Sequence, residues 1–222
     1  MSRRLQTTEV QRLLAQMEHE LAALDSGGFV MLVDGKPLMV GSHSKDPDAH
    51  WGHIRRGFGK GYKLHAIYSS AGVPMAWELT PLNQAEPEVA AQLIPALRRG
   101  GGYLVGDRAY DSNPLHDLAL FAGCQLVAPR KRPRSGLGHR RHSPGRLRSI
   151  ELLQTDFGKA LHAFRDEVER RFGWLTTHGA GLAPLPNWVR RLPRARLWVQ
   201  AKLLIHATYV YLTSPSKLLA VA

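Results

Sequence analysis

Hydrophobic spacing divides the chain into an ordered series of helices and strands. Five segments have the spacing or composition of helices, namely residues 7–25, 86–97, 113–122, 151–177 and 195–212. Five short β-rich runs predict strands at residues 29–33, 63–68, 74–79, 103–105 and 125–128. Three strands in a meander, followed by helix, strand, helix and strand, are typical of a mixed sheet covered by helices. We therefore expect an α/β fold with a mixed five-stranded sheet.

Turn residues and chain length refine this picture. The pairs Asp34-Gly35 and Ala71-Gly72 have the composition of hairpin turns. A length of 222 residues allows one sizeable domain, which we expect over residues 29–212. Residues 1–28 are expected to supply one helix, too little for a complete DNA-reading helix-turn-helix domain, and residues 213–222 a tail.

The charge balance favours an anionic partner. The chain has 30 Lys plus Arg against 18 Asp plus Glu, a formal net charge of +12, and 22 of the 30 cations are Arg. Arg grips phosphate oxygens with a planar, two-pronged donor group, so nucleic acid is the first partner to consider. One cysteine excludes an intramolecular disulfide framework. With neither a signal peptide nor a membrane-spanning run apparent, we expect a cytoplasmic protein that does not bind membranes.

Positive charge is concentrated in residues 130–148. This stretch has eight Lys or Arg residues, two His and no acidic residue, and Gly and Pro interrupt it. We interpret it as a loop-like strip that binds phosphate, although a solvated linker would have the same composition.

In so basic a chain, three acidic residues are candidates for chemistry. Asp34 follows the apolar run of the first predicted strand, where an ordinary turn is the alternative. Asp107 follows the strand at 103–105, and α/β sheets place their chemistry at such strand ends. Asp111, just downstream, is better explained as the cap of the next helix.

The third candidate, Glu169, is selected by helix geometry. At 100° per residue from Val168, the centre of the apolar face, Arg165 lies near 60°, Glu169 near 100° and His162 near 120°. These three residues form one stripe at the edge of the buried face. An exposed ion pair between Arg165 and Glu169 is the alternative role.

Three carboxylates in one cleft would repel one another unless a cation neutralised them. Hard oxygen ligands suit Mg²⁺ or Mn²⁺, and in a basic protein that binds phosphodiesters they indicate phosphoryl transfer with two metal ions.

Four motifs together resemble the DDE transposases of bacterial insertion sequences. They are Leu-Val-Asp34-Gly-Lys-Pro-Leu, Gly59-Lys-Gly-Tyr-Lys-Leu-His65, Gly106-Asp107-Arg-Ala-Tyr-Asp111 and Arg165-Asp-Glu-Val-Glu169-Arg-Arg-Phe-Gly-Trp-Leu175. They occur in the family's order over residues 29–212. The resemblance is to the fourth and fifth insertion-sequence families, and the 62 residues from Asp107 to Glu169 bring the chain nearer to the fifth.

The resemblance implies a ribonuclease H-like fold in which Asp34, Asp107 and Glu169 hold two Mg²⁺ or Mn²⁺ ions. It also implies double-stranded DNA as partner, at the element ends and at the target, a homodimer on that DNA, and a location at the bacterial nucleoid. Arg165 would orient Glu169. The basic residues expected to contact DNA are Lys60, Lys63, Arg108, Arg130, Lys131, Arg132, Arg134, Arg140, Arg141 and Arg165.

Some positions depart from the family pattern. His162 replaces the Tyr of the family's late signature, and Thr176 replaces its Lys, which in the family helps to hold DNA phosphate. Together with the short N-terminal segment, these departures keep open a rival interpretation, a DNA-binding remnant or regulator that does not cut DNA.

Other assignments are weaker. His43, His50 and His53, like His139 and His142, could suggest a transition-metal site, but no Cys or acid lies at ligand spacing. Gly57–Gly61 lacks the context of a nucleotide-binding loop. Trp51 could stack on an extruded base. An RNA-binding protein is disfavoured by the pattern of strands and acids.

Overall fold

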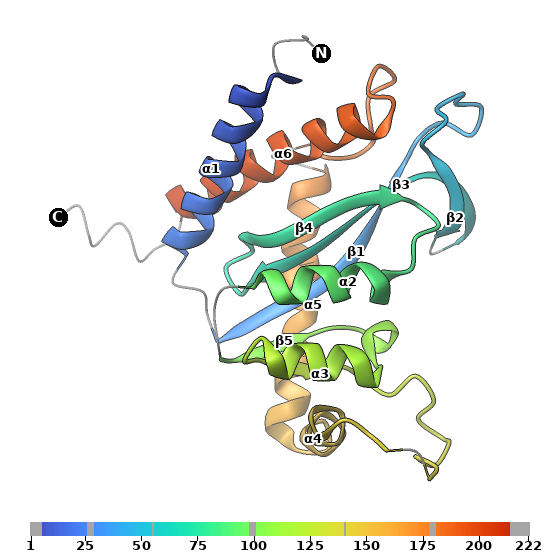
Figure 1. The fold of residues 1–222 in the computed structure, drawn as a ribbon, viewed down its shortest axis with the longest axis vertical. Helices are drawn as coiled ribbons and strands as arrows, with labels where there is room; N and C mark the ends of the chain where they lie inside the picture. The colour runs from blue at the N-terminus through green and yellow to red at the C-terminus, as the bar shows by residue number, and fades with distance from the viewer. Residues whose placement is uncertain are drawn as a thin grey trace, which may run out of the picture.

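A mixed sheet forms the middle layer of the molecule. The computed structural model describes residues 6–25, 29–54, 56–97, 101–139, 141–177 and 181–213. The strands are β1 (Val30–Met39), β2 (His50–Ile54), β3 (Gly57–Ser69), β4 (Pro74–Pro81), β5 (Tyr103–Val105) and β6 (Gln125–Val127). The α-helices are α1 (Thr8–Leu24), α2 (Glu86–Leu93), α3 (Asn113–Phe121), α4 (Pro144–Leu152), α5 (Asp156–Thr177) and α6 (Leu192–Thr213). Two 3₁₀ turns, η2 (Ile94–Ala96) and η3 (Arg108–Tyr110), follow α2 and β5 (Figure 1).

The strand order is β2-β3-β1-β5-β6, and β4 also pairs with β3. Strands β1 to β4 pair antiparallel with their neighbours, whereas β1, β5 and β6 run parallel. This arrangement confirms the predicted α/β fold and the meander that opens it. The strand β2 was not predicted, because its sequence His-Trp-Gly-His-Ile has neither an apolar run nor an apolar-polar alternation.

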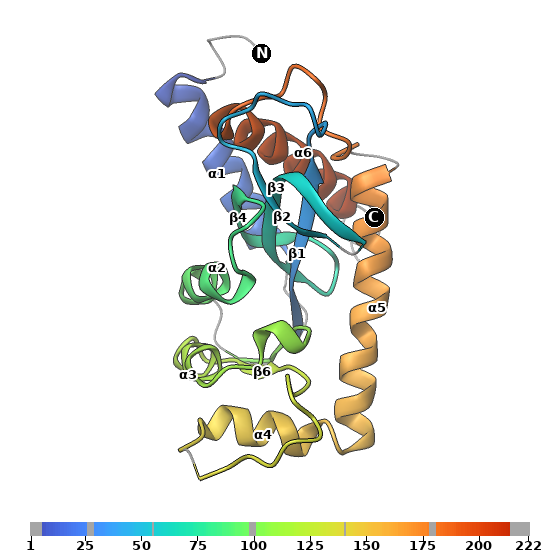
Figure 2. The same cartoon turned by 90° about the vertical axis from the view of Figure 1, so that its right-hand side faces the viewer.

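Helices cover both faces of the sheet. Figure 2 shows the sheet between α5 on one side and α2 and α3 on the other. Alternate residues of β1 enter two separate hydrophobic clusters, because successive side chains of a strand point to opposite faces. Leu32 packs in the cluster with Leu161 and Leu175 of α5, whereas Met31 packs in the cluster with Leu115 of α3.

One of the two predicted hairpin turns is wrong. Asp34 and Gly35 lie in the middle of β1, opposite Ala66 and His65 of β3, because β3 is long enough to pair with β1 as far as Met39. The turn at Ala71-Gly72 is confirmed. Gly72 has a φ of +89°, which glycine adopts without strain, and its N–H donates to the Ser69 carbonyl at 2.9 Å.

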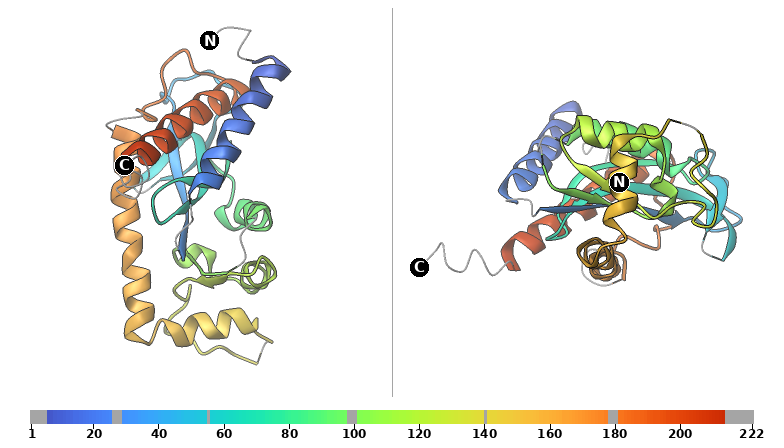
Figure 3. Two further views of the ribbon diagram at one scale, coloured as in Figure 1. Left: turned by 90° about the vertical axis from the view of Figure 1, so that its left-hand side faces the viewer. Right: turned by 90° about the horizontal axis from the view of Figure 1, so that it is seen from below.

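The long helix predicted at 151–177 is two helices, α4 and α5. Residues 153–155 interrupt it, and the Thr155 hydroxyl accepts a hydrogen bond from the Gly158 N–H at 3.0 Å, as an N-cap does. The helix α4 begins at Pro144, so only the first part of the basic segment 130–148 is a loop. Figure 3 shows α4 at the opposite end of the molecule from α1 and α6.

The start of α6 is held by a loop that is distant in sequence. The Asp46 carboxylate accepts hydrogen bonds from the Arg191 N–H at 3.0 Å and the Tyr62 hydroxyl at 2.7 Å, and Asp48 accepts from the Leu192 N–H at 2.8 Å. Because the first N–H groups of a helix have no partners within the helix, these carboxylates satisfy donors that would otherwise be unpaired. No described helix is both long and apolar enough to cross a bilayer.

Replacing Asp46 by Ala is expected to lower the free energy of unfolding by about 3 kcal/mol, because it removes the acceptor for three buried or half-buried donors, the Tyr62 hydroxyl and the N–H groups of Asp48 and Arg191. Urea denaturation measures this loss. Asp117→Ala, on the exposed side of α3, is the matched control and should change stability by less than about 0.5 kcal/mol. Equal stabilities for the two variants would contradict the anchoring role of Asp46.

Candidate active site

Parallel pairing places two of the three candidate acids side by side. Leu32 of β1 pairs with Val105 of β5, and both side chains pack in the cluster under α5. Asp34 comes two residues after Leu32, and Asp107 two residues after Val105. Because side chains alternate along an extended chain, both acids lie on the same face as these apolar residues. Both acids therefore face α5 at neighbouring positions, although Asp34 lies within its strand and not at the strand end expected from the sequence.

The backbone around Asp107 continues the sheet by one step. The Gly106 N–H donates to the Val127 carbonyl at 3.0 Å, and Asp107 is still extended. A side chain at Gly106 would meet Tyr110 and Val33 at less than 3 Å, so glycine is required there. The Asp107 carboxylate accepts a hydrogen bond from the Ala109 N–H at 2.6 Å and so caps η3, which fixes one of its oxygens.

The third acid comes from α5, which packs against β1 and β5. Glu169 pairs with Arg165 one turn earlier, with 2.6 Å between Oε1 of Glu169 and Nη2 of Arg165. The Glu169 side chain is 47% exposed and that of Arg165 is 21% exposed. The predicted ion pair is therefore present, and it lies on the side of α5 from which its charges reach Asp34.

Electrostatic effects on Asp34 show how near these groups are. Burial is the main cause that raises the pKa of Asp34 to about 6; Arg165 and a hydrogen bond from the Gly35 N–H act to lower it, and the negative charges of Glu169 and Glu86 add to the effect of burial. On the neighbouring helix, burial and then Arg165 lower the pKa of His162, whereas Asp166 and Asp107 act to raise it. The charges of all three candidate acids therefore act within one region.

The donor set suits a hard divalent cation, but the carboxylates are not yet gathered around one point. Among the residues that the structure describes, no three His, Cys, Asp or Glu side chains lie close enough to hold one metal ion, and this includes the His residues near β2 and in the basic segment. Glu169 is turned toward Arg165. A cation beside Asp34 would offset both the cost of burying its charge and its repulsion from Glu169, so the chemistry of the site fits Mg²⁺ or Mn²⁺.

The predicted DNA-contacting residues fall into two groups. Two are tied into the fold: Lys60 donates to the Ser44 carbonyl at 2.8 Å, and Lys63 lies 3.4 Å from Glu86 with only 13% of its side chain exposed. Arg165 is occupied by Glu169. Most of the others are exposed, namely Arg108, Lys131, Arg132, Arg134 and Arg141, while Arg130 is half-buried and Arg140 lies outside the described residues.

Two features near the site were not found from the sequence. Glu86, the first residue of α2, is a fourth acid whose charge reaches Asp34. Asp111 was expected to cap α3, but the cap position is Ser112, and the buried Asp111 carboxylate instead binds Arg146 of α4 through Nε at 2.6 Å and Nη2 at 2.9 Å. Only the tertiary structure brings these partners together, since 35 residues separate them.

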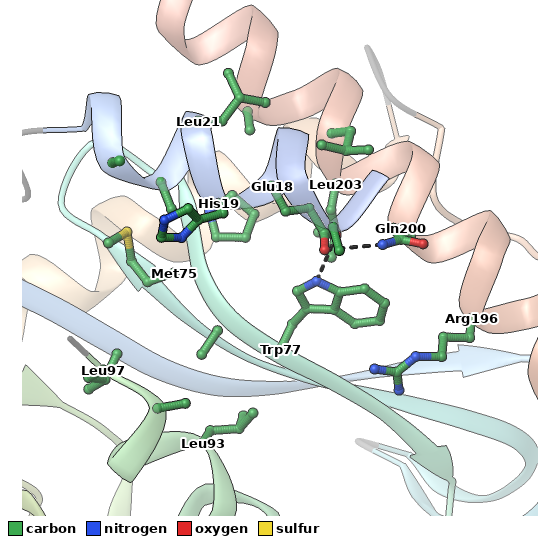
Figure 4. Close-up of a pocket in the computed structure, with 18 of the residues that line it drawn as sticks. Glu18, His19, Leu21, Met75, Trp77, Leu93, Leu97, Arg196, Gln200 and Leu203 are labelled. Carbon is green, nitrogen blue, oxygen red and sulfur yellow. Dashed lines mark hydrogen bonds between the residues drawn. The ribbon is translucent and has the colours of Figure 1, made fainter. Parts of the chain in front are cut away.

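A cavity of about 720 Å³ lies elsewhere, between α1, β4 and α6 (Figure 4). Its polar centre is Glu18, which accepts hydrogen bonds from Trp77 Nε1 at 3.0 Å and Gln200 Nε2 at 3.1 Å. Burial raises the pKa of Glu18, although these two hydrogen bonds and Arg196 act to lower it. None of the three candidate acids lines this cavity, so we assign its contacts to the attachment of α1 and not to the candidate active site.

The structure is thus a mixed α/β sheet with one candidate acid within β1, a second just after β5 and a third on the covering helix α5. Comparison with family models identifies the particular family: residues 26–203 match the model of the transposase DDE domain. The chain belongs to this family, and its fold is ribonuclease H-like. No curated protein sequence matches the chain.

Two similar solved structures are transposases. The chain resembles a piggyBac transposase in a cryo-EM synaptic complex with hairpin DNA, at 12% identity and a TM-score of 0.58. The match covers 95% of this chain and 52% of the other, so the chain spans about half the length of that transposase. The Mos1 transposase in a paired-end complex with the left transposon end also matches, at 13% identity, 90% and 60% coverage and a TM-score of 0.33, too low to support an argument about the fold.

The raised pKa of Asp34 predicts how the stability of the protein changes with pH. Between about pH 4 and pH 6, the Asp34 carboxyl is ionised in the unfolded state but still protonated in the folded state. The free energy of unfolding therefore falls as the pH rises through this range. Asp34→Asn removes that cost. We expect the variant to gain roughly 1–3 kcal/mol relative to the wild type between pH 4 and pH 7, measured by urea denaturation. A stability difference that does not change with pH would contradict the burial of this charge.

Proposed function

We propose that the chain is the catalytic domain of a metal-dependent DNA transposase, which cleaves strands at the ends of its element and transfers the freed 3′-hydroxyls to target DNA. One observation carries the proposal: β1–β5 pairing puts Asp34 and Asp107 on the sheet face that α5 covers, and Glu169 lies on α5 within electrostatic reach. Three hard-oxygen donors in a basic protein of this family are suited to phosphodiester chemistry.

Each acid would have a distinct part in that site. Asp34 and Asp107 would hold the ions from the sheet and Glu169 from the helix. Two bound divalent ions would supply activation of water or a 3′-hydroxyl and stabilisation of the leaving oxygen. The low-dielectric surroundings that raise the pKa of Asp34 strengthen the attraction of its carboxylate for any cation.

Before a cation binds, Arg165 would orient Glu169 at the edge of the site through the ion pair now observed. With 21% of its side chain exposed, Arg165 also presents positive charge to the same face as the acids, where it would offset repulsion between them and an incoming phosphate.

DNA would enter along the edge of the sheet that carries Asp107. The strand β6 ends at Val127, beside Val105 of β5, so the basic segment that follows β6 starts at this edge. Its exposed cations would bind backbone phosphates without reading sequence. Thr176, which stands at the position of the family's Lys, is buried. Another residue would have to bind the phosphate that the family's Lys binds, and we propose that the basic segment does so.

Joining two element ends to one target requires two active sites in proximity. The similar piggyBac structure is of a synaptic complex with hairpin DNA. We therefore propose that this chain acts as a homodimer on double-stranded DNA. We also propose, from the spacing of its motifs, that it is nearer to the fifth insertion-sequence family.

The direct test is nicking of duplex DNA that carries the element ends, with Mg²⁺ or Mn²⁺. The wild type should nick at the ends, and Asp107→Ala and Glu169→Ala should each lose more than about a hundredfold in rate. Asp156→Ala is a matched control, because this exposed acid lies at the start of the same helix, about 20 Å from Glu169, and should retain the wild-type rate.

Binding of the same DNA separates the two functions that the sequence left open. If the wild type binds end DNA but neither it nor any variant nicks it, the chain is a DNA-binding remnant or regulator and the catalytic proposal fails. Equal nicking by the wild type and both acid variants would point to a contaminating nuclease and would equally refute the assignment.

A further inference from the structure

The first part of the basic segment is folded around a buried carboxylate. Asp111 is only 4% exposed, and its two oxygens accept hydrogen bonds from the Arg146 side chain and from the Lys131 N–H at 3.0 Å. Burial acts to raise the pKa of Asp111, but hydrogen bonds from Arg146 and Lys131, together with the His116 ring 3.7 Å away, outweigh burial and hold the pKa well below its usual range. Asp111 is therefore a fixed negative charge beneath the segment.

His142 extends this contact to the middle of the loop. Arg146 Nη1 lies 2.9 Å from His142 Nδ1, and His142 Nε2 lies 2.8 Å from the Leu137 carbonyl. Because a guanidinium can only donate and a carbonyl can only accept, the imidazole must accept at Nδ1 and donate at Nε2. One continuous chain of hydrogen bonds thus runs from Asp111 through Arg146 and His142 to Leu137.

A second clamp fixes the far end of the loop. The Asn113 side chain donates to the Arg141 carbonyl at 3.3 Å and accepts from the Ser143 N–H at 3.2 Å. Residues 130–139 and 141–143, which we call the basic loop, are therefore held near the beginning, the middle and the end, at Lys131, Leu137 and Ser143.

These internal contacts leave the loop's cations free to meet a partner. Lys131, Arg132, Arg134, His139 and Arg141 are all exposed, and the loop contains no acid. The contacts that hold the loop use backbone groups, the side chains of Asp111, Asn113, His142 and Arg146, and the half-buried Arg130, which donates to the Pro133 and Ser135 carbonyls. The exposed cations are consequently not needed to maintain its shape.

We infer that Asp111, Arg146 and His142 are positioning residues that hold the basic loop in one conformation as a preformed phosphate-binding surface beside Asp107. The inference rests on the proposed function, since it deepens the account of how DNA is bound. A loop that is ordered before binding does not lose its conformational freedom on meeting DNA, so preorganisation raises affinity without any added contact.

His142 gives the sharpest test, because it is half-buried and its replacement is compatible with the fold. His142→Leu can neither accept from Arg146 nor donate to Leu137, whereas His142→Gln has one acceptor and one donor in its amide. His139→Leu is the matched control, since it removes an exposed imidazole from the same loop.

Two measurements are made on the full chain. Hydrogen exchange of the DNA-free protein should show that His142→Leu speeds exchange of backbone amides at residues 131–143 by about tenfold, with no change in the sheet or in the melting temperature. Fluorescence anisotropy with duplex DNA at several salt concentrations should show about tenfold weaker binding for the same variant with an unchanged salt dependence, because the phosphate contacts themselves remain. His142→Gln should restore both, and His139→Leu should keep wild-type exchange.

The outcomes separate this inference from the proposed function. Failure of the wild type to bind DNA would refute the DNA-binding role itself. Wild-type binding together with unchanged loop exchange in His142→Leu would overturn the positioning role alone. Weaker DNA binding without faster exchange would make His142 a direct phosphate contact, and faster exchange throughout the protein would make it a residue of general stability; either result also contradicts the inference.

Discussion

The parallel pairing of β1 with β5 is the constraint on which the site depends. Because Leu32 pairs with Val105, the next residues on the same face are Asp34 and Asp107, which are 73 positions apart in the sequence. The same register sends the apolar side chains before these acids into the cluster under α5. Packing of α5 on the sheet and approach of Glu169 to the two aspartates are therefore consequences of one arrangement.

That arrangement concentrates negative charge in a protein with a net charge of +12, and the fold offsets the repulsion locally. Arg165 pairs with Glu169 and also acts to lower the pKa of Asp34. Lys63 pairs with Glu86 behind the strand, and Arg146 pairs with Asp111 beside it. Of the described acids discussed above, Glu169, Glu86 and Asp111 thus each have a cationic partner, and Asp34 and Asp107 are the pair that comes from the sheet.

The sequence predicted the fold class, most strands and the motif that carries the acids, because apolar runs and helical spacing record burial directly. The sequence indicated a turn at Asp34, because Asp-Gly is a common turn pair. In the structure β1 continues through Asp34, because it pairs with the long strand β3, and the length of β3 is set by tertiary pairing. Neither β2 nor the interruption at Thr155 was predicted. The roles of Asp46, Asp111 and Glu86 depend on long-range partners, from Tyr62, 16 residues after Asp46, to Arg191, 145 residues after it, and no local pattern encodes such contacts.

The central claim is that Asp34, Asp107 and Glu169 form one cation site between the sheet and α5. It is tested most directly by a crystal structure of the protein with Mn²⁺ and anomalous scattering data. The account predicts anomalous density next to the carboxylates of Asp34 and Asp107, with Glu169 turned from Arg165 toward it. Mn²⁺ bound only elsewhere, with Glu169 still paired to Arg165 at millimolar metal, would contradict the account.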